Sequence, residues 1–156
     1  VTSSALINLL INLLVVIVFV IIFGGHISLY TILLPLVILE LYIFALAVLF
    51  FLAAAYVKFR DVNYIWEVGI QLLFFVTPIV YPLSYLTNVQ FQQILALNPL
   101  TQIIQDARWL LTEDVTTVYE LLKFPLLLIP FLIVALAIFI SGKYFKNQSK
   151  DFAENV

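Results

Sequence analysis

Long apolar segments separated by short polar ones dominate the chain. Four apolar runs cover approximately residues 5–23, 30–56, 64–80 and 118–140. A helix needs about 20 apolar residues to cross a hydrocarbon layer of about 30 Å, and its backbone polar groups are then paired internally. The pattern therefore predicts an all-α, polytopic membrane protein whose four transmembrane helices form a single domain over residues 1–156.

The segment between the third and fourth runs, residues 82–112, predicts a pair of short helices. Residues 89–97 mix apolar side chains with glutamines. Asn98 followed by Pro99 is a favourable helix start, because asparagine caps the first turn and proline fits its first position. Apolar positions then recur at helical spacing as far as Leu111, with polar side chains on the other side. We expect a re-entrant or interfacial pair that borders a hydrated space; the alternative is a surface helix that only anchors the domain.

Basic residues predict how the chain is oriented. Lys58 and Arg60 lie between the second and third runs, and Lys143, Lys146 and Lys150 follow the fourth. Loops on the cytoplasmic side of membrane proteins carry an excess of Lys and Arg. We therefore expect both ends of the chain, including a tail over residues 141–156, to be cytoplasmic and residues 82–112 to face outward.

Composition excludes several classes of protein. The chain is 65% hydrophobic and 10% charged, with mean hydropathy +1.18, whereas soluble domains are about 45–50% apolar and about 25% charged. A soluble monomer is excluded. With no cysteine, one histidine and no GxxxxGK[ST] motif, we expect no catalytic site, no metal site and no nucleotide site on this chain. The net charge of −2 provides no basic surface for nucleic acid.

Glu40 is the one charged residue deep inside an apolar run. A carboxylate at the centre of a transmembrane helix costs at least about 2.5 kcal/mol, so this side chain should face the bundle, a partner or water. It is either a pathway or coupling residue, or a protonated carboxyl bonded to a neighbouring helix. The charged turn at residues 58–61 likewise has two interpretations: it transmits force from a soluble partner, or it is an ordinary positive-inside anchor.

Three stretches together resemble a known family of transporters. FRDV at residues 59–62, QLLFF at 71–75 running into TPIVYP at 77–82, and LNPLT at 97–101 are similar to the ABC-type polysaccharide-export permeases. These are type-2 ABC exporters of O-antigen, capsular polysaccharide or teichoic acid. The resemblance covers essentially the whole chain, in order and with similar spacing.

The resemblance implies a six-helix permease of the bacterial cytoplasmic (inner) membrane. It implies a homodimer, a separate ABC ATPase subunit that binds ATP and Mg²⁺, and a polymer path between the two permease subunits. Because only four runs are present and the chain begins at Val1, we expect it to be the C-terminal portion of such a permease, surrounded by membrane lipid. The turn formed by Lys58, Phe59, Arg60 and Asp61 would then lie near the ATPase and couple to it.

These observations favour a permease subunit that exports a lipid-linked polysaccharide. Two alternatives stay open: export of a small hydrophobic drug or lipid by the same architecture, and a non-transporting membrane anchor or assembly protein. The residues expected to border the pathway or its outer gate are Phe74, Phe75, Tyr81, Asn98, Gln102, Gln105 and Asp106.

Overall fold

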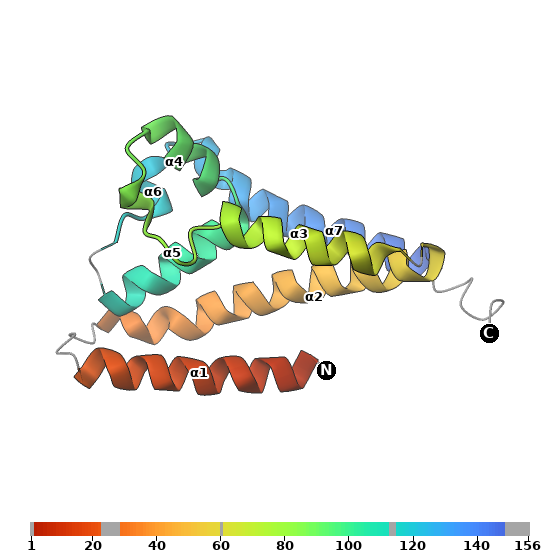
Figure 1. Cartoon of the computed structure of the whole chain (residues 1–156), viewed down its shortest axis with the longest axis horizontal. Coiled ribbons are helices and arrows are strands. Elements are labelled where there is room, and N and C mark those ends of the chain that lie inside the picture. The colour runs from red at the N-terminus through yellow and green to blue at the C-terminus, as the bar shows by residue number, and fades with distance from the viewer. Residues whose placement is uncertain (1, 23–28, 60, 113–114, 149–156) are drawn as a thin grey trace.

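A computed structural model describes residues 2–22, 29–59, 61–112 and 115–148, and these ranges contain helices and connecting turns without any β-strand. The longer helices run roughly along the longest axis of the molecule, and the shorter ones gather near one end (Figure 1). The helices are α1 (Thr2–Ile22), α2 (Leu34–Lys58), α3 (Val62–Val76), α4 (Val89–Ala96), α5 (Pro99–Thr112), α6 (Val118–Leu121) and α7 (Ile129–Gln148), with 3-10 turns η1 (Leu29–Leu33), η2 (Leu83–Tyr85) and η3 (Leu126–Leu128).

Three stretches of the described chain are long and apolar enough to cross a membrane. They are Ser4–Ile22, Leu29–Tyr56 and Leu126–Lys146. The remaining apolar helix, α3, has 15 residues, which corresponds to about 22 Å and is shorter than a typical hydrocarbon layer. The prediction of an all-α polytopic membrane protein is confirmed.

The helix predicted over residues 64–80 ends earlier in the structure. α3 stops at Val76, and Thr77 is extended, with φ −89° and ψ 129°. Pro78 explains this, because a proline disfavours helical conformation in the residue before it.

The last predicted run, residues 118–140, also differs in the structure, where it is two helices rather than one. α6 ends at Leu121, Leu122 is extended, and α7 begins only at Ile129. Pro125 lies in the interval, where its missing N–H prevents a continuous helix, whereas Pro130 is tolerated in the first turn of α7. The helix then continues to Gln148, through the first half of the region expected to be a tail.

α2 and α7 form the most extensive helix pair in the bundle. Ala47 and Ala54, seven residues apart on one face of α2, are 4% and 0% exposed, and small residues of this kind allow membrane helices to approach closely. The ring centroids of Phe50 and Phe145 are 5.3 Å apart, so aromatic contacts also join the far ends of the two helices. The shorter helix α5 packs against both members of this pair.

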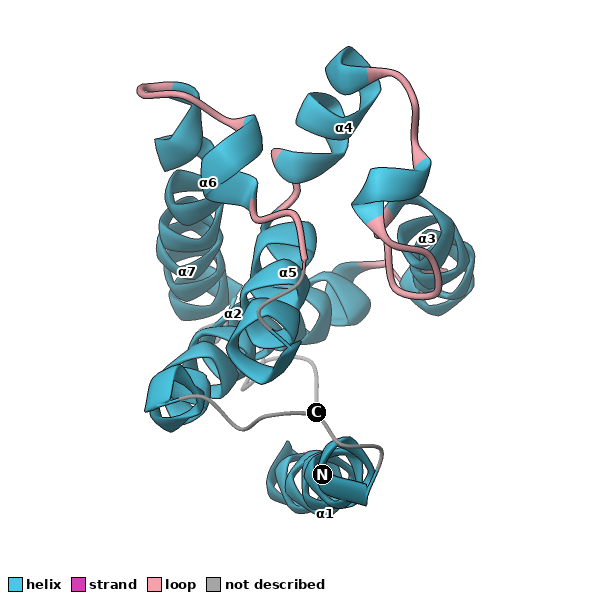
Figure 2. Cartoon of the chain, turned by 90° about the vertical axis from the view of Figure 1, so that its left-hand side faces the viewer, coloured by secondary structure: helices cyan, strands magenta, loops and turns pink. Residues whose placement is uncertain are grey.

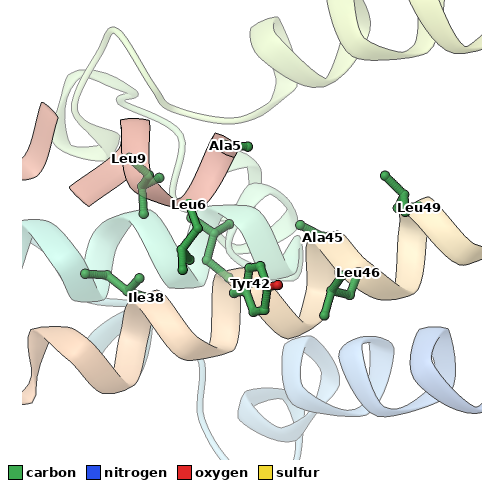
Figure 3. Close-up of a pocket in the computed structure, with 9 residues that line it drawn as sticks. Ala5, Leu6, Leu9, Ile38, Tyr42, Ala45, Leu46 and Leu49 are labelled. Atoms are coloured by element: carbon green, nitrogen blue, oxygen red, sulfur yellow. The ribbon is translucent and has the colours of Figure 1, made fainter. Parts of the chain in front are cut away.

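α1 lies alongside α2, with an apolar cleft of about 340 Å³ between the two helices (Figure 3). Leu6 and Leu9 of α1 line the cleft together with Ile38, Tyr42 and Leu46 of α2. None of the described α1 side chains is buried. An apolar, exposed helix of this kind is suited to contact with lipid tails.

The first residues of α1, the turn between α2 and α3, and the end of α7 lie toward one end of the molecule, and α4, α5 and α6 lie at the other (Figure 1). The predicted orientation requires the two chain ends and the connection between α2 and α3 to lie on one side of the membrane and residues 82–112 on the other, and this arrangement agrees with it. Which end faces the cytoplasm stays a prediction.

Candidate functional site

α5 is the central helix at the end of the molecule that carries the short helices. Figure 2, which looks at this end, shows α5 in the middle of the view, and α5 contacts α2, α4, α6 and α7. Its polar residues Thr101, Gln102 and Gln105 are 0%, 1% and 0% exposed. α5 is therefore enclosed by other helices rather than lying on the molecular surface, and its polar face is turned inward.

Asn98 fixes the start of α5. Its side-chain Oδ1 accepts a hydrogen bond from the backbone N–H of Leu100 at 3.1 Å, so the N-cap predicted from the sequence is confirmed. The Nδ2 of the same side chain donates to Oγ1 of Thr77 at 3.0 Å. Thr77 is fully buried at the end of α3. One asparagine thus begins α5 and ties it to α3.

Arg108 connects α5 to the segment directly after α3. Its guanidinium donates to the carbonyl oxygen of Pro78 at 2.8 Å and also to that of Ile79. Both carbonyls belong to the non-helical segment after α3, where no helix supplies their partners. Near the other end of α5, the hydroxyl of Thr31 in η1 donates to the carbonyl of Leu110 at 2.7 Å.

Four polar side chains from three helices meet beside α5. Nε2 of Gln102 donates to Oδ2 of Asp106 at 2.7 Å and to Oε2 of Glu40, on α2, at 3.4 Å. The hydroxyl of Tyr119, on α6, donates to the same Asp106 oxygen at 3.1 Å. Glu40 therefore faces the bundle and α5. The network links α5 to α2 through Gln102 and Glu40, and α5 to α6 through Asp106 and Tyr119.

Burial shifts the titration of two members of this network. It raises the pKa of Asp106 above its ordinary value, and the hydrogen bonds from Gln102 and Tyr119 oppose the shift because they stabilise the carboxylate. Burial also raises the pKa of Tyr119, and the nearby Asp106 adds to that effect. The phenol is accordingly a hydrogen-bond donor across the physiological range.

The network borders a cleft of about 700 Å³ between α2, α5, α6 and the start of α7. The lining residues are Leu33, Leu36, Val37, Glu40, Gln102, Asp106, Trp109, Leu110, Thr117, Tyr119, Glu120 and Phe131. We call this space the acidic cleft. Three of its side chains are carboxylic acids, and no described lining residue is basic.

Several buried polar atoms of α5 have no hydrogen-bond partner among the described residues. They are Oγ1 of Thr101, Oε1 of Gln102, and both Nε2 and Oε1 of Gln105. Buried polar groups in proteins are nearly always paired with protein or water. These atoms therefore indicate positions for water or for a ligand along α5.

The structure separates the outer-gate candidates predicted from the sequence. Gln102 and Asp106 line the acidic cleft, whereas Phe74 and Asn98 line a different, largely apolar cleft of about 590 Å³ between α2 and α3. Phe75 is 73% exposed. The candidates are thus divided between two clefts: Gln102 and Asp106 share one, and Phe74 and Asn98 share the other.

The remaining predicted positions are distributed as follows. The hydroxyl of Tyr81 donates to the carbonyl of Phe75 at 3.0 Å, outside both clefts. In the turn between α2 and α3, Phe59 and Asp61 are exposed. Arg60 and the side chain of Lys58 lie outside the described residues. The proposed coupling role of this turn stays a prediction.

Tyr119 is a member of the network that the sequence did not indicate. Its partner Asp106 is 13 positions away, across the end of α5. No periodicity or motif joins the two positions. Only the proline break that shortens the last helix puts α6 over α5.

Comparison with known proteins now decides the family. A family model described as ABC-2 type transporter matches residues 1–112, from α1 to the end of α5. The chain belongs to this family.

A curated relative gives a finer comparison with this ABC-2 type transporter chain. It is similar to the "O-antigen export system permease protein RfbA" of Myxococcus xanthus, with 30% identity over 135 residues. The match covers 86% of the chain and 50% of the relative, so the chain spans about half the length of that protein. The family resemblance read from the sequence motifs is confirmed, and it agrees with a multi-pass membrane protein.

Proposed function

We propose that the chain is the membrane-spanning permease portion of an ATP-driven exporter that moves a lipid-linked polysaccharide across the cytoplasmic membrane. A separate ABC ATPase subunit would bind ATP and Mg²⁺, and a second copy of the permease would complete the path. The observation that supports this most directly is the 30% identity, over 135 residues, to a protein described as an O-antigen export permease.

The connections of α5 suggest how force would cross the membrane. α2 ends at Lys58 and α3 begins at Val62, both at the end of the molecule away from α5 (Figure 1). α3 and the residues directly after it hold α5 through Asn98 and Arg108, and α2 holds it through Glu40. α2 has 25 residues and is about 37 Å long, so displacing the turn would displace the supports of α5. For this to occur, the ATP-bound and ATP-free forms of the ATPase subunit must favour different positions of the turn.

A second candidate function is export of a small hydrophobic compound. The cleft between α2 and α3 has a volume of about 590 Å³ and is lined mainly by apolar side chains, including Phe44, Leu73 and Phe74. This volume lies within the range of pockets that hold drug-sized ligands, about 300–1,000 Å³. The apolar character of the cleft favours such a compound over a hydrated sugar chain.

A complementation experiment distinguishes the two functions. The complete polypeptide that contains these residues, with its ATPase subunit, is expressed in a strain that lacks its own polysaccharide exporter. Restored surface polysaccharide, detected by antibody, would support the proposal. Resistance to hydrophobic toxins without restored polysaccharide would support the second candidate and contradict the first.

Arg60→Glu in the same polypeptide tests the coupling turn. We expect export to be lost while ATP hydrolysis and membrane insertion persist, because reversing the charge disrupts contact with the ATPase without changing the helices. Lys143→Glu is the matched control, because Lys143 is an exposed basic residue in the C-terminal part of α7. This variant should keep export. Normal export by Arg60→Glu would remove the coupling role.

A further inference from the structure

The acidic cleft has an unbalanced charge. Glu40, Asp106 and Glu120 all line it, and no described lining residue is basic. The one arginine on α5, Arg108, is bound to the carbonyl oxygens of Pro78 and Ile79. Glu40 and Asp106 are half-buried, whereas Glu120 is exposed. A carboxylate withdrawn from water is costly unless it is paired with an opposite charge. The cleft therefore favours a cation.

Two of these carboxylates are close together. Glu40 and Asp106 accept hydrogen bonds from the same nitrogen of Gln102, at 3.4 Å and 2.7 Å. Their bonded oxygens are consequently no more than about 6 Å apart. The donor Nε2 is already shared between them, and Tyr119 has only one hydroxyl hydrogen, which it gives to Asp106. The protein supplies no further donor to this pair among the contacts described.

Gln102 provides an independent indication of a ligand. Its side chain lines the cleft and is 1% exposed, yet its Oε1 has no hydrogen-bond partner in the described part of the chain. Oε1 is an acceptor, as are the remaining lone pairs of Glu40 and Asp106. The unused hydrogen-bonding capacity of the cleft thus calls for a group that donates several hydrogen bonds and carries positive charge.

The other walls of the cleft restrict the class of cation. Leu36, Val37 and Phe131 provide apolar surface, and Trp109 provides an aromatic ring, which attracts cations through its face. No three acidic or histidine side chains in the described ranges are grouped so that they could hold a metal ion. An organic cation with an apolar portion matches both parts of the cleft.

We propose that the acidic cleft binds the primary ammonium group of an amphipathic molecule, with the head group of an aminophospholipid as its source. The ammonium donates to Glu40, Asp106 and the free oxygen of Gln102, and the apolar part lies against Leu36 and Phe131. This site does not depend on the proposed export function. It would make the contact between α2 and α5 sensitive to the surrounding lipid.

Native mass spectrometry of the complete polypeptide tests the proposal. Nanodiscs of phosphatidylglycerol contain equal small fractions of phosphatidylethanolamine and phosphatidylcholine with identical acyl chains. We expect retention of phosphatidylethanolamine to exceed that of phosphatidylcholine by about tenfold, because the trimethylated head group has no N–H to donate. Equal retention of the two lipids would overturn the proposal, and this comparison needs no mutation.

Variants then assign the site. Asp106→Asn and Glu40→Gln should each reduce retention of phosphatidylethanolamine by about tenfold, since each removes a charged acceptor of nearly unchanged shape. Glu67→Gln, at an exposed carboxylate of α3 outside the acidic cleft, is the control and should retain the lipid. Unchanged retention by both cleft variants would contradict the assignment. Displacement of the lipid by dissolved glucosamine, which has no alkyl chain, would overturn the lipid source in favour of an amino sugar.

Discussion

Asn98→Ala should destabilise the bundle more than the loss of an ordinary helix cap, because Asn98 performs two functions. Its Oδ1 caps α5 through the backbone N–H of Leu100, and its Nδ2 bonds the buried hydroxyl of Thr77 on α3. Alanine removes both interactions. It leaves Thr77, which is 0% exposed, without this partner.

The magnitude follows from these two contacts. Replacing an asparagine N-cap by alanine costs about 1 kcal/mol. Loss of the contact to a buried hydroxyl costs a further 1 kcal/mol, approximately, a value above the average of about 0.6 kcal/mol measured between membrane helices because Thr77 is completely buried. We expect Asn98→Ala to lower the free energy of unfolding by about 2 kcal/mol.

The chain offers a matched control for this measurement. Asn88 caps α4 in the same manner, with its Oδ1 accepting from the N–H of Gln90 at 2.9 Å. It lies at an exposed site, and within the described ranges its side chain bonds only the first turn of α4. Asn88→Ala should therefore cost about 1 kcal/mol or less. Both variants are measured by reversible unfolding of the complete polypeptide in mixed micelles, with helix content followed by circular dichroism.

A double-mutant cycle isolates the bond between the two helices. Thr77→Val removes the hydroxyl and preserves the shape of the side chain. If Asn98 and Thr77 interact as the structure shows, the combined loss will be smaller than the sum of the single losses by at least about 0.6 kcal/mol. Strict additivity, or equal effects of Asn98→Ala and Asn88→Ala, would refute the reasoning.

Three further predictions concern the surroundings of α5. Arg108→Gln should speed hydrogen exchange of the amides next to the proline break after α3, because the charged donor to two carbonyls is lost at a cost of about 1.5–3 kcal/mol; unchanged exchange would contradict that role. A cysteine at Tyr85, which is 78% exposed, should react with a membrane-impermeant maleimide added from outside, whereas one at Phe59, which is 56% exposed, should not; the reverse pattern would overturn the predicted orientation. Burial raises the pKa of Asp106, so the folded state holds this proton more tightly than the unfolded state does. The resulting stability is complete below the ordinary pKa of aspartate and is lost as pH rises through the raised value. Unfolding titrations should therefore show stability falling with rising pH, and falling less in Asp106→Asn; an identical slope in both proteins would refute the assignment.

The sequence was most informative where the physical signal is local. Apolar length predicted the membrane-spanning helices, and the dipeptide formed by Asn98 and Pro99 predicted the start of α5 because a cap requires only residues within one turn. The prediction over residues 118–140 failed to anticipate a break, although Pro125 was visible. Apolar length outweighed the proline in that interpretation, whereas in the structure the missing N–H ends α6 and delays α7 to Ile129.

The sequence by itself determined the class of protein and the family, and it predicted that Glu40 faces away from lipid. Hydropathy, motifs and a charge within an apolar run are all properties of neighbouring residues, so they can be read without the fold. The tertiary structure alone decided what Glu40 meets. Gln102 is 62 positions away from it, and Tyr119 reaches the same network from a third helix. This contact depends on how helices of different lengths pack against one another, and the spacing of residues along one helix does not encode that packing.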